Sequence, residues 1–237
     1  VEIAFFGGSF TGIDVELQKE LLETAYEYIK EKKVHSIRIS TRPDAIDDEI
    51  LTLLKKYGVT SIELGAQSLN DTVLKSNNRG HTAQDVANAS NLIKQYGFNL
   101  GLQMMTGLYN DCDEYAIATA REIIKLKPQT VRIYPTIVLK NTDLAALYSD
   151  NIYKPQTLEA ATELCSKLLL MFEKENIKVI RLGLHSIEKD SYIAGPWHPA
   201  FSELCYSKIL LNNAKLLLNE TGSYILYVNP SSISKMI

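Results

Sequence analysis

Apolar residues recur along the chain in two alternating rhythms. Short runs that alternate apolar and polar side chains are typical of strands, and longer stretches with apolar residues three or four apart are typical of amphipathic helices. Strand-like runs begin near residues 1, 35, 60, 98, 131 and 178, and helical patterns cover residues 17–29, 46–57, 83–96, 113–126 and 157–175. Serial strand–helix units of this kind predict an α/β fold with a parallel sheet covered by helices.

The two faces of the predicted strands differ in polarity. In the second strand, Ile37 and Ile39 lie on one face while Arg38 and Ser40 lie on the other, because successive side chains alternate across a sheet. Later strands repeat the pattern, with Glu63, Gln67, Arg132 and Arg181 on the polar face. A closed barrel fills its interior with layers of Val, Ile and Leu. We therefore predict an incompletely closed barrel whose concave face holds a polar ligand.

Four arginines on or beside this face bear on the chemistry of that ligand: Arg38, Arg42, Arg132 and Arg181. Guanidinium groups favour carboxylates and phosphates. The alternative is that these arginines pair with Glu63 and other carboxylates inside the lumen, since buried charges usually pair. For any single arginine we favour pairing, and for the whole set we favour a ligand site.

The first strand runs directly into a glycine-rich turn. Val1 to Phe6 is apolar, and Gly7, Gly8 and Ser9 follow before the first helical pattern. Without Cβ atoms, two successive glycines bring backbone N–H and C=O groups against a small ligand, although the same glycines are also typical of a simple tight turn. The first strand has no predicted neighbour on its outer side. We expect self-association through this edge.

Bulk composition narrows the class of protein. The 237 residues are 46% hydrophobic with a net charge of −3, so no global field attracts nucleic acid, and no run spans a bilayer or resembles a secretory signal. The three cysteines, Cys112, Cys165 and Cys205, lack metal-site spacing and indicate a cytoplasmic protein with reduced thiols. We predict no metal site; His81 is expected to be a cap or core residue, and His198 either contacts substrate or packs.

Several ordered motifs resemble one enzyme family. They are FFGGSFTGI, ISTRPDAID, IELGAQSLND, NRGHT, QMMTGLYND and VRIYPTIVLKNTDLAALY. Together they resemble the radical S-adenosylmethionine (radical SAM) enzymes, in the branch of the Elongator catalytic subunit, with oxygen-independent coproporphyrinogen III oxidase as a more distant relative. The resemblance implies a partial (β/α)6 TIM-like barrel in residues 1–190, with the first βα unit missing from this fragment. Residues 191–237 are expected to form a C-terminal loop and a helix or strand packed on the barrel.

The same resemblance implies a set of cofactor-binding residues. Gly7, Gly8 and Ser9 correspond to the motif whose backbone receives the methionine amino group of S-adenosylmethionine. The ribose and carboxylate positions fall on Ser40, Gln67, Arg79 and Gln103. Ser9 and Ser40 stand where Glu is common in relatives, and Gln103 stands where the porphyrinogen enzymes have Asp. Arg79 suits a carboxylate, because a guanidinium grips one through two parallel hydrogen bonds.

The family's CxxxCxxC motif, which holds a [4Fe–4S] cluster, does not occur in this chain. The resemblance implies that the full-length protein binds this cluster and makes a 5′-deoxyadenosyl radical, with tRNA as the substrate by analogy with Elongator. The chain alone is expected to be inactive. Two alternatives remain open: an enzyme like coproporphyrinogen oxidase, and a cluster-free barrel that binds a nucleotide-like ligand.

Overall fold

A computed structural model describes residues 1–6, 8–184, 187–217, 225 and 227. Its main sheet has six strands in the order β1-β2-β3-β4-β5-β7, and every neighbouring pair is parallel. The strands are β1 (Glu2–Phe5), β2 (Ser36–Thr41), β3 (Val59–Gln67), β4 (Asn99–Thr106), β5 (Thr130–Pro135) and β7 (Lys178–Leu182). Each matches a predicted strand, so the α/β fold with a curled, partial barrel is confirmed.

The two edges of this sheet are β1 and β7. Within the described residues, β1 pairs with β2 alone, and its side chains Glu2 and Ala4 are exposed. Val1 and Phe6, at the two ends of this strand, are 87% and 53% exposed. The sheet is therefore open, as the polar concave face predicted, and β1 presents a free edge.

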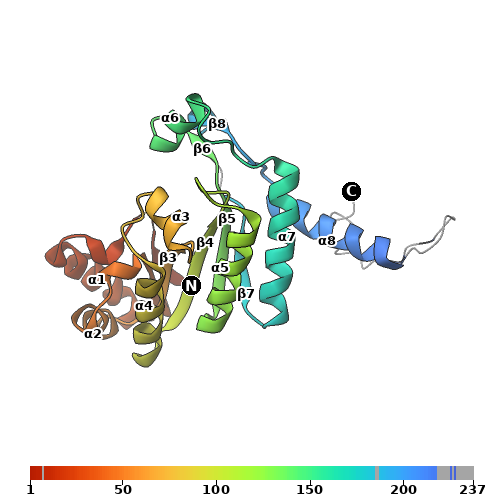
Figure 1. Cartoon of the computed structure of the whole chain (residues 1–237). Coiled ribbons are helices and arrows are strands. Elements are labelled where there is room, and N and C mark those ends of the chain that lie inside the picture. The colour runs from red at the N-terminus through yellow and green to blue at the C-terminus, as the bar shows by residue number, and fades with distance from the viewer. Residues whose placement is uncertain (7, 185–186, 218–224, 226, 228–237) are drawn as a thin grey trace.

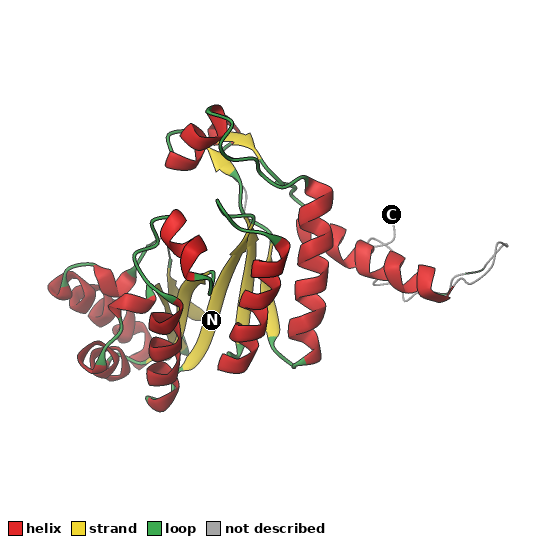
Figure 2. Cartoon of the chain, viewed as in Figure 1, coloured by secondary structure: helices red, strands yellow, loops and turns green. Residues whose placement is uncertain are grey.

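Helices cover the convex face of the sheet, and Figures 1 and 2 show α4, α5 and α7 side by side in front of the strands. The five helices predicted from periodicity are α1 (Val15–Lys30), α2 (Asp48–Lys56), α4 (Ala83–Gln95), α5 (Asp113–Leu126) and α7 (Leu158–Lys174). The core lies between the two layers. Its fully buried side chains include Leu22, Ile37, Ile39, Leu51, Ile62, Leu64, Ile93, Leu100 and Phe172.

Local sequence signals account for the helix boundaries. The Asp14 carboxylate accepts backbone N–H groups at the start of α1, and Thr82 and Asp85 form a reciprocal capping box on α4. Gly58 and Gly97 follow α2 and α4 with φ of 75° and 81°, a left-handed conformation that favours glycine.

Several short elements were not predicted. α3 (Asp71–Ser76) follows β3, and α6 (Asp143–Ser149) lies between β6 (Val138–Leu139) and the next helix. β6 pairs antiparallel with β8 (Tyr192–Ala194), and Figure 1 shows this two-stranded sheet and α6 beyond the ends of the main strands. α8 (Phe201–Leu217) packs against α7. β8 and α8 lie in the predicted 191–237 extension; its boundary with the barrel stays a prediction.

Candidate functional site

An ionic layer crosses the concave face of the barrel. The Glu63 carboxylate on β3 accepts hydrogen bonds from Arg132 on β5, from Nε at 2.8 Å and from Nη2 at 3.0 Å. Arg38 on β2 donates to the same carboxylate and also to Glu2. Glu63 and Arg132 are 5% and 7% exposed. Both charges are therefore paired where an unpaired charge would be costly.

Phe6, at the end of β1, packs on this layer. Its ring centre lies 5.1 Å from the Arg38 guanidinium carbon and 5.0 Å from that of Arg132, within the range of cation–π attraction. At the amino ends of the strands, a cavity of about 320 Å³ is lined in part by Glu2, Ser61 and Asn99. Arg38 and Glu63 line the same cavity, so the ionic layer borders it.

The other two arginines are also partnered. Arg181 donates to the backbone carbonyls of Gly183 at 3.1 Å and Leu184 at 2.7 Å, and Arg42 pairs with Asp44. The structure therefore pairs Arg38, Arg132 and Arg42 with carboxylates, whereas Arg181 meets backbone carbonyls alone. A ligand role for the whole set stays a prediction.

The loop after β1 is anchored to β2 through hydroxyl groups. Ser9 Oγ lies 2.9 Å from Thr41 Oγ1 and accepts the backbone N–H of Arg42 at 3.3 Å. A Cβ added at Gly8 would meet no atom within 4 Å, so the backbone there borders open space. Gly7 lies outside the described residues. The Ser9 side chain is thus already engaged, which leaves only backbone groups for a ligand.

Three predicted residues lie on the concave face. Gln103 Nε2 donates to Gln67 Oε1 at 3.3 Å, so the structure brings these two amides together. Gln67 is the last residue of β3 and has φ of 62°. Ser40 stands beside Glu63 in the register of β2 and β3. The three side chains thus share the concave face with the ionic layer.

Arg79 differs from the other arginines discussed above. Its side chain makes no hydrogen bond or ion pair with any residue in the described part of the chain, and its Nε is buried without a partner. Burial lowers the pKa of this guanidinium, and the nearby charge of Arg42 lowers it further. Its backbone is fixed, because Arg79 N–H donates to the Leu74 carbonyl at 3.1 Å. A partly buried, unpartnered guanidinium is a good anion-binding group.

His81 and His198 have backbone partners. His81 is 7% exposed, immediately precedes the N-cap of α4, and lies with Nε2 3.1 Å from the Ala66 carbonyl oxygen. This position confirms that it is a cap or core residue. His198 Nδ1 accepts the Ala200 N–H at 3.1 Å near the start of α8. Gly195, in the same loop, lies against Ile137, which follows the end of β5. Contact of His198 with substrate stays a prediction.

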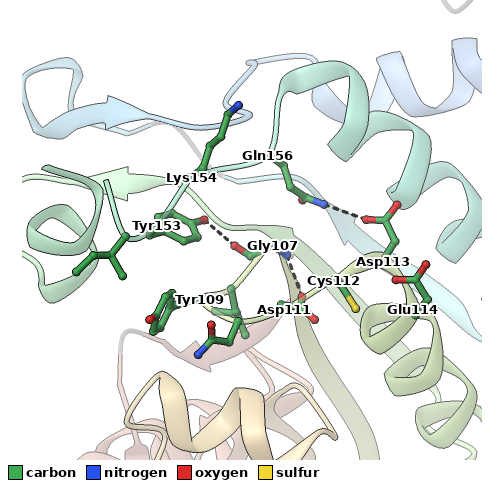
Figure 3. A pocket seen from close by; sticks show the side chains of 12 residues that line it. Gly107, Tyr109, Asp111, Cys112, Asp113, Glu114, Tyr153, Lys154 and Gln156 are labelled. Carbon is green, nitrogen blue, oxygen red and sulfur yellow. Dashed lines mark hydrogen bonds between the residues drawn. The ribbon is translucent and has the colours of Figure 1, made fainter. Parts of the chain in front are cut away.

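A cavity of about 470 Å³ follows β4, lined by residues 107–114 and 152–154 and by Gln156 (Figure 3). Tyr153 donates to the Gly107 carbonyl at 2.6 Å, and the Gly107 N–H donates to Asp111 Oδ2 at 3.0 Å. Burial raises the pKa of Asp111 to about 6 and that of Tyr153 to about 12. Asp111 Oδ1 is buried without a partner, so its charge is poorly compensated. Sequence reasoning missed this site, because nothing local signals the burial of Asp111.

The cysteines do not form a cluster site. Cys112 is exposed at the start of α5, whereas Cys165 on α7 and Cys205 on α8 are buried. Burial raises the pKa of Cys205 to about 12, far from the thiolate form that binds iron. Within the described part of the chain, no group of three His, Cys, Asp or Glu residues is arranged to hold a metal ion. These residues do not fit a [4Fe–4S] cluster.

Comparison with known proteins identifies the family. Residues 4–123 match the radical SAM superfamily, and residues 128–210 match the radical SAM C-terminal domain. The chain belongs to the radical SAM superfamily. The predicted resemblance to the Elongator branch is also confirmed by individual relatives. The tRNA uridine(34) acetyltransferase of Methanocaldococcus jannaschii is 27% identical over 70% of this chain and 34% of its own length.

Two further relatives support the same branch and fold. Elongator complex protein 3 of Schizosaccharomyces pombe is 33% identical over 60% of this chain and 26% of its own length. The structure of Methanocaldococcus infernus Elp3 superposes with a TM-score of 0.79 at 23% identity, covering 90% of this chain and 54% of that one. The chain spans about a third of the length of the curated relatives it matches. No helix in its described residues is long and apolar enough to cross a membrane.

Proposed function

We propose that this chain is the S-adenosylmethionine-binding barrel of a radical SAM enzyme, in which Arg79 binds the cofactor carboxylate. The unpartnered guanidinium of Arg79 supports this most directly. It borders a cavity of about 550 Å³ that is also lined by Lys75 and Asp71, whose opposite charges offset each other. A buried cation without an acceptor gains most from a ligand that supplies one.

The remaining residues of the proposed site have separate roles. The backbone around Gly8 and Ser9 binds the methionine amino group, and the amides of Gln67 and Gln103, with the Ser40 hydroxyl, bind the polar groups of the ribose. Gly7 belongs to the same proposed motif. In this superfamily, S-adenosylmethionine bound at a [4Fe–4S] cluster supplies a 5′-deoxyadenosyl radical. This chain's residues bind and orient the cofactor.

Calorimetry with S-adenosylmethionine tests the proposal. The Arg79→Ala variant should bind it about tenfold to hundredfold more weakly, the loss expected for a hydrogen bond to a charged group. Arg121→Ala is the matched control, because Arg121 is exposed on α5. A decarboxylated analogue should bind the wild type and Arg79→Ala nearly equally. Unchanged binding of S-adenosylmethionine by Arg79→Ala would remove Arg79 from the site.

Gly8→Val tests the glycine turn by a different physical effect. A Cβ at Gly8 meets no protein atom within 4 Å, but the backbone φ of 157° is one that residues with a side chain rarely adopt, so valine there strains the loop as well as blocking the ligand. We expect this variant to bind both S-adenosylmethionine and the decarboxylated analogue poorly, with a somewhat lower melting temperature than the wild type. Normal binding of either ligand would exclude close approach of the ligand to Gly8.

We further propose that the complete protein modifies tRNA. This proposal is supported by the names of the relatives, one a tRNA uridine(34) acetyltransferase and the other Elongator complex protein 3. Mass spectrometry of tRNA nucleosides from cells with and without the gene tests it. Loss of a modified nucleoside in the deletion strain is expected, and identical nucleoside profiles would contradict a tRNA substrate.

Two alternatives carry less support. The likeness to the Escherichia coli coproporphyrinogen III oxidase, with a TM-score of 0.57 at 16% identity, concerns the fold alone. A cluster-free barrel that binds a nucleotide-like ligand requires no iron ligands. A CxxxCxxC motif ahead of Val1 in the complete gene would favour the enzyme, and its absence there would favour the binding barrel.

A further inference from the structure

The ring of His81 faces two backbone carbonyl groups. Its Nε2 lies 3.1 Å from the oxygen of Ala66, at the end of β3, and its Nδ1 lies 3.2 Å from the oxygen of Arg79. Ala66 directly precedes Gln67, so this one ring joins the backbones beside two residues of the proposed cofactor site. Because His81 is 7% exposed, water does not readily replace either partner.

Carbonyl oxygens accept hydrogen bonds and never donate them. A neutral imidazole carries one N–H, so it satisfies one carbonyl and directs a nitrogen lone pair at the other. An imidazolium carries two N–H groups and satisfies both. The attachment of the Arg79 loop to β3 therefore differs by one hydrogen bond between the two forms of the ring.

Charged groups of both signs surround the ring. The pKa of Asp44 is lowered first by its hydrogen bond from Arg42, and that of Asp85 first by hydrogen bonds from Thr82; the charge of His81 lowers both further. These two carboxylates, from the loop after β2 and from α4, and the guanidinium groups of Arg42 and Arg79 are the charged groups around the ring.

We propose that His81 is a positioning residue that tethers Arg79 to the end of β3, and that protonation of its ring strengthens binding of a carboxylate-bearing ligand. The inference rests on the proposed function for the identity of that ligand, S-adenosylmethionine. It needs no contact between His81 and the ligand. The ring acts through the backbone of Arg79, whose guanidinium makes the contact.

Calorimetry with S-adenosylmethionine at about pH 5.5 and about pH 8 tests the proposal. Wild-type affinity should rise about tenfold towards the lower pH, the effect of one additional hydrogen bond to a charged group. His81→Phe should bind weakly with a flat profile, and His81→Gln, whose uncharged amide can still donate to the Ala66 carbonyl, should be intermediate and flat. His35→Gln, altered just before β2 at the amino end of the sheet, should keep the wild-type profile.

Nitrogen NMR of the His81 ring provides a readout that does not depend on the cofactor. It records at which pH the ring carries two protonated nitrogens, and an affinity that does not rise as the ring gains its second proton would overturn the proposal. Coincident pH profiles of the wild type and His81→Phe would also overturn it. If the ring is doubly protonated but the wild type binds no S-adenosylmethionine at any pH, the tether stands and the proposed function fails.

Discussion

Glu63 binds Arg132 across an intervening strand. The carboxylate on β3 and the guanidinium on β5 meet over β4, where Gly101 stands beside Glu63 in the register. A side chain at position 101 would fill the space through which Glu63 reaches. The pairing of two charged residues thus depends on a third residue that contributes no side chain.

We expect Gly101→Ala to destabilise the fold. A Cβ at this position would lie 2.8 Å from Glu63 Cγ and 2.9 Å from Thr130 Oγ1, so both side chains must move. Overpacking of this kind costs about 1–3 kcal/mol in the free energy of unfolding, measurable by chemical denaturation. Asn91→Ala, at an exposed position of α4, is the control. Equal stability of the two variants would contradict the close approach at Gly101.

Glu63→Gln tests the ionic layer itself. Glutamine keeps the shape of the side chain but leaves Arg132, which is 7% exposed, without a countercharge. Removing one partner of a buried pair costs about 3–5 kcal/mol in the free energy of unfolding. Arg38 contributes less to this loss, because it keeps its ion pair with Glu2. The control is Glu16→Gln, at an exposed pair with Lys19, where we expect a change below about 0.5 kcal/mol. Similar losses in both variants would refute a buried network.

Asp111→Asn should stabilise the protein at neutral pH. The pKa of Asp111 is raised by burial from 3.8 to about 6, so the folded state holds this proton more tightly than the unfolded state. Stability is therefore lost as the pH rises from about 4 to about 6, by at most about 3 kcal/mol. Asparagine keeps an acceptor for the Gly107 N–H without the charge.

Thermal unfolding across pH checks this sign. The advantage of Asp111→Asn should be present at about pH 7.5 and disappear below about pH 3, where the wild-type carboxyl is protonated in both states. Asp113→Asn, at an exposed position in the first turn of α5, is the control and should show no such gain. A constant difference between Asp111→Asn and wild type at both pH values would contradict a shifted carboxyl.

The free edge of β1 should cause self-association. Unpaired backbone groups of an edge strand form a template for another chain, and Val1 and Phe6 add exposed apolar surface. Sedimentation velocity at rising concentration should show oligomers in the wild type. Ala4→Lys, which places a charge on an exposed position of this strand, should shift the chain towards monomer. A wild type that stays monomeric at high concentration would refute the prediction.

The regular part of the fold could be predicted from the sequence because its signals are local. Alternation in segments such as Ser36–Thr41 records which side chains meet the helices, and buried apolar side chains recur in β3, β4 and β5. The short elements lack such a period. α3 has six residues, and its end is held by Asn77, whose amide donates to the distant Tyr109 carbonyl at 2.8 Å. Contacts of this kind are invisible to a local pattern.

The candidate site was predictable in composition but not in pairing. Alternation placed Arg38, Arg132 and Glu63 on one face, and pairing with Glu63 was one of two interpretations. Choosing between them requires knowing that Gly101 leaves room between β3 and β5, which depends on strand order and register. Arg79 was selected by motif alone, and the structure adds that its guanidinium lacks a partner among the described residues.

The ionic layer has a consequence for selectivity. Two arginines, Arg38 and Arg132, are balanced there by two glutamates, Glu2 and Glu63, so the ionic layer carries no formal net charge. The net charge of this layer therefore neither attracts nor repels a charged ligand. Under the proposed function, discrimination between anionic and neutral ligands therefore depends on Arg79, in the loop held against the end of β3, and not on the ionic layer.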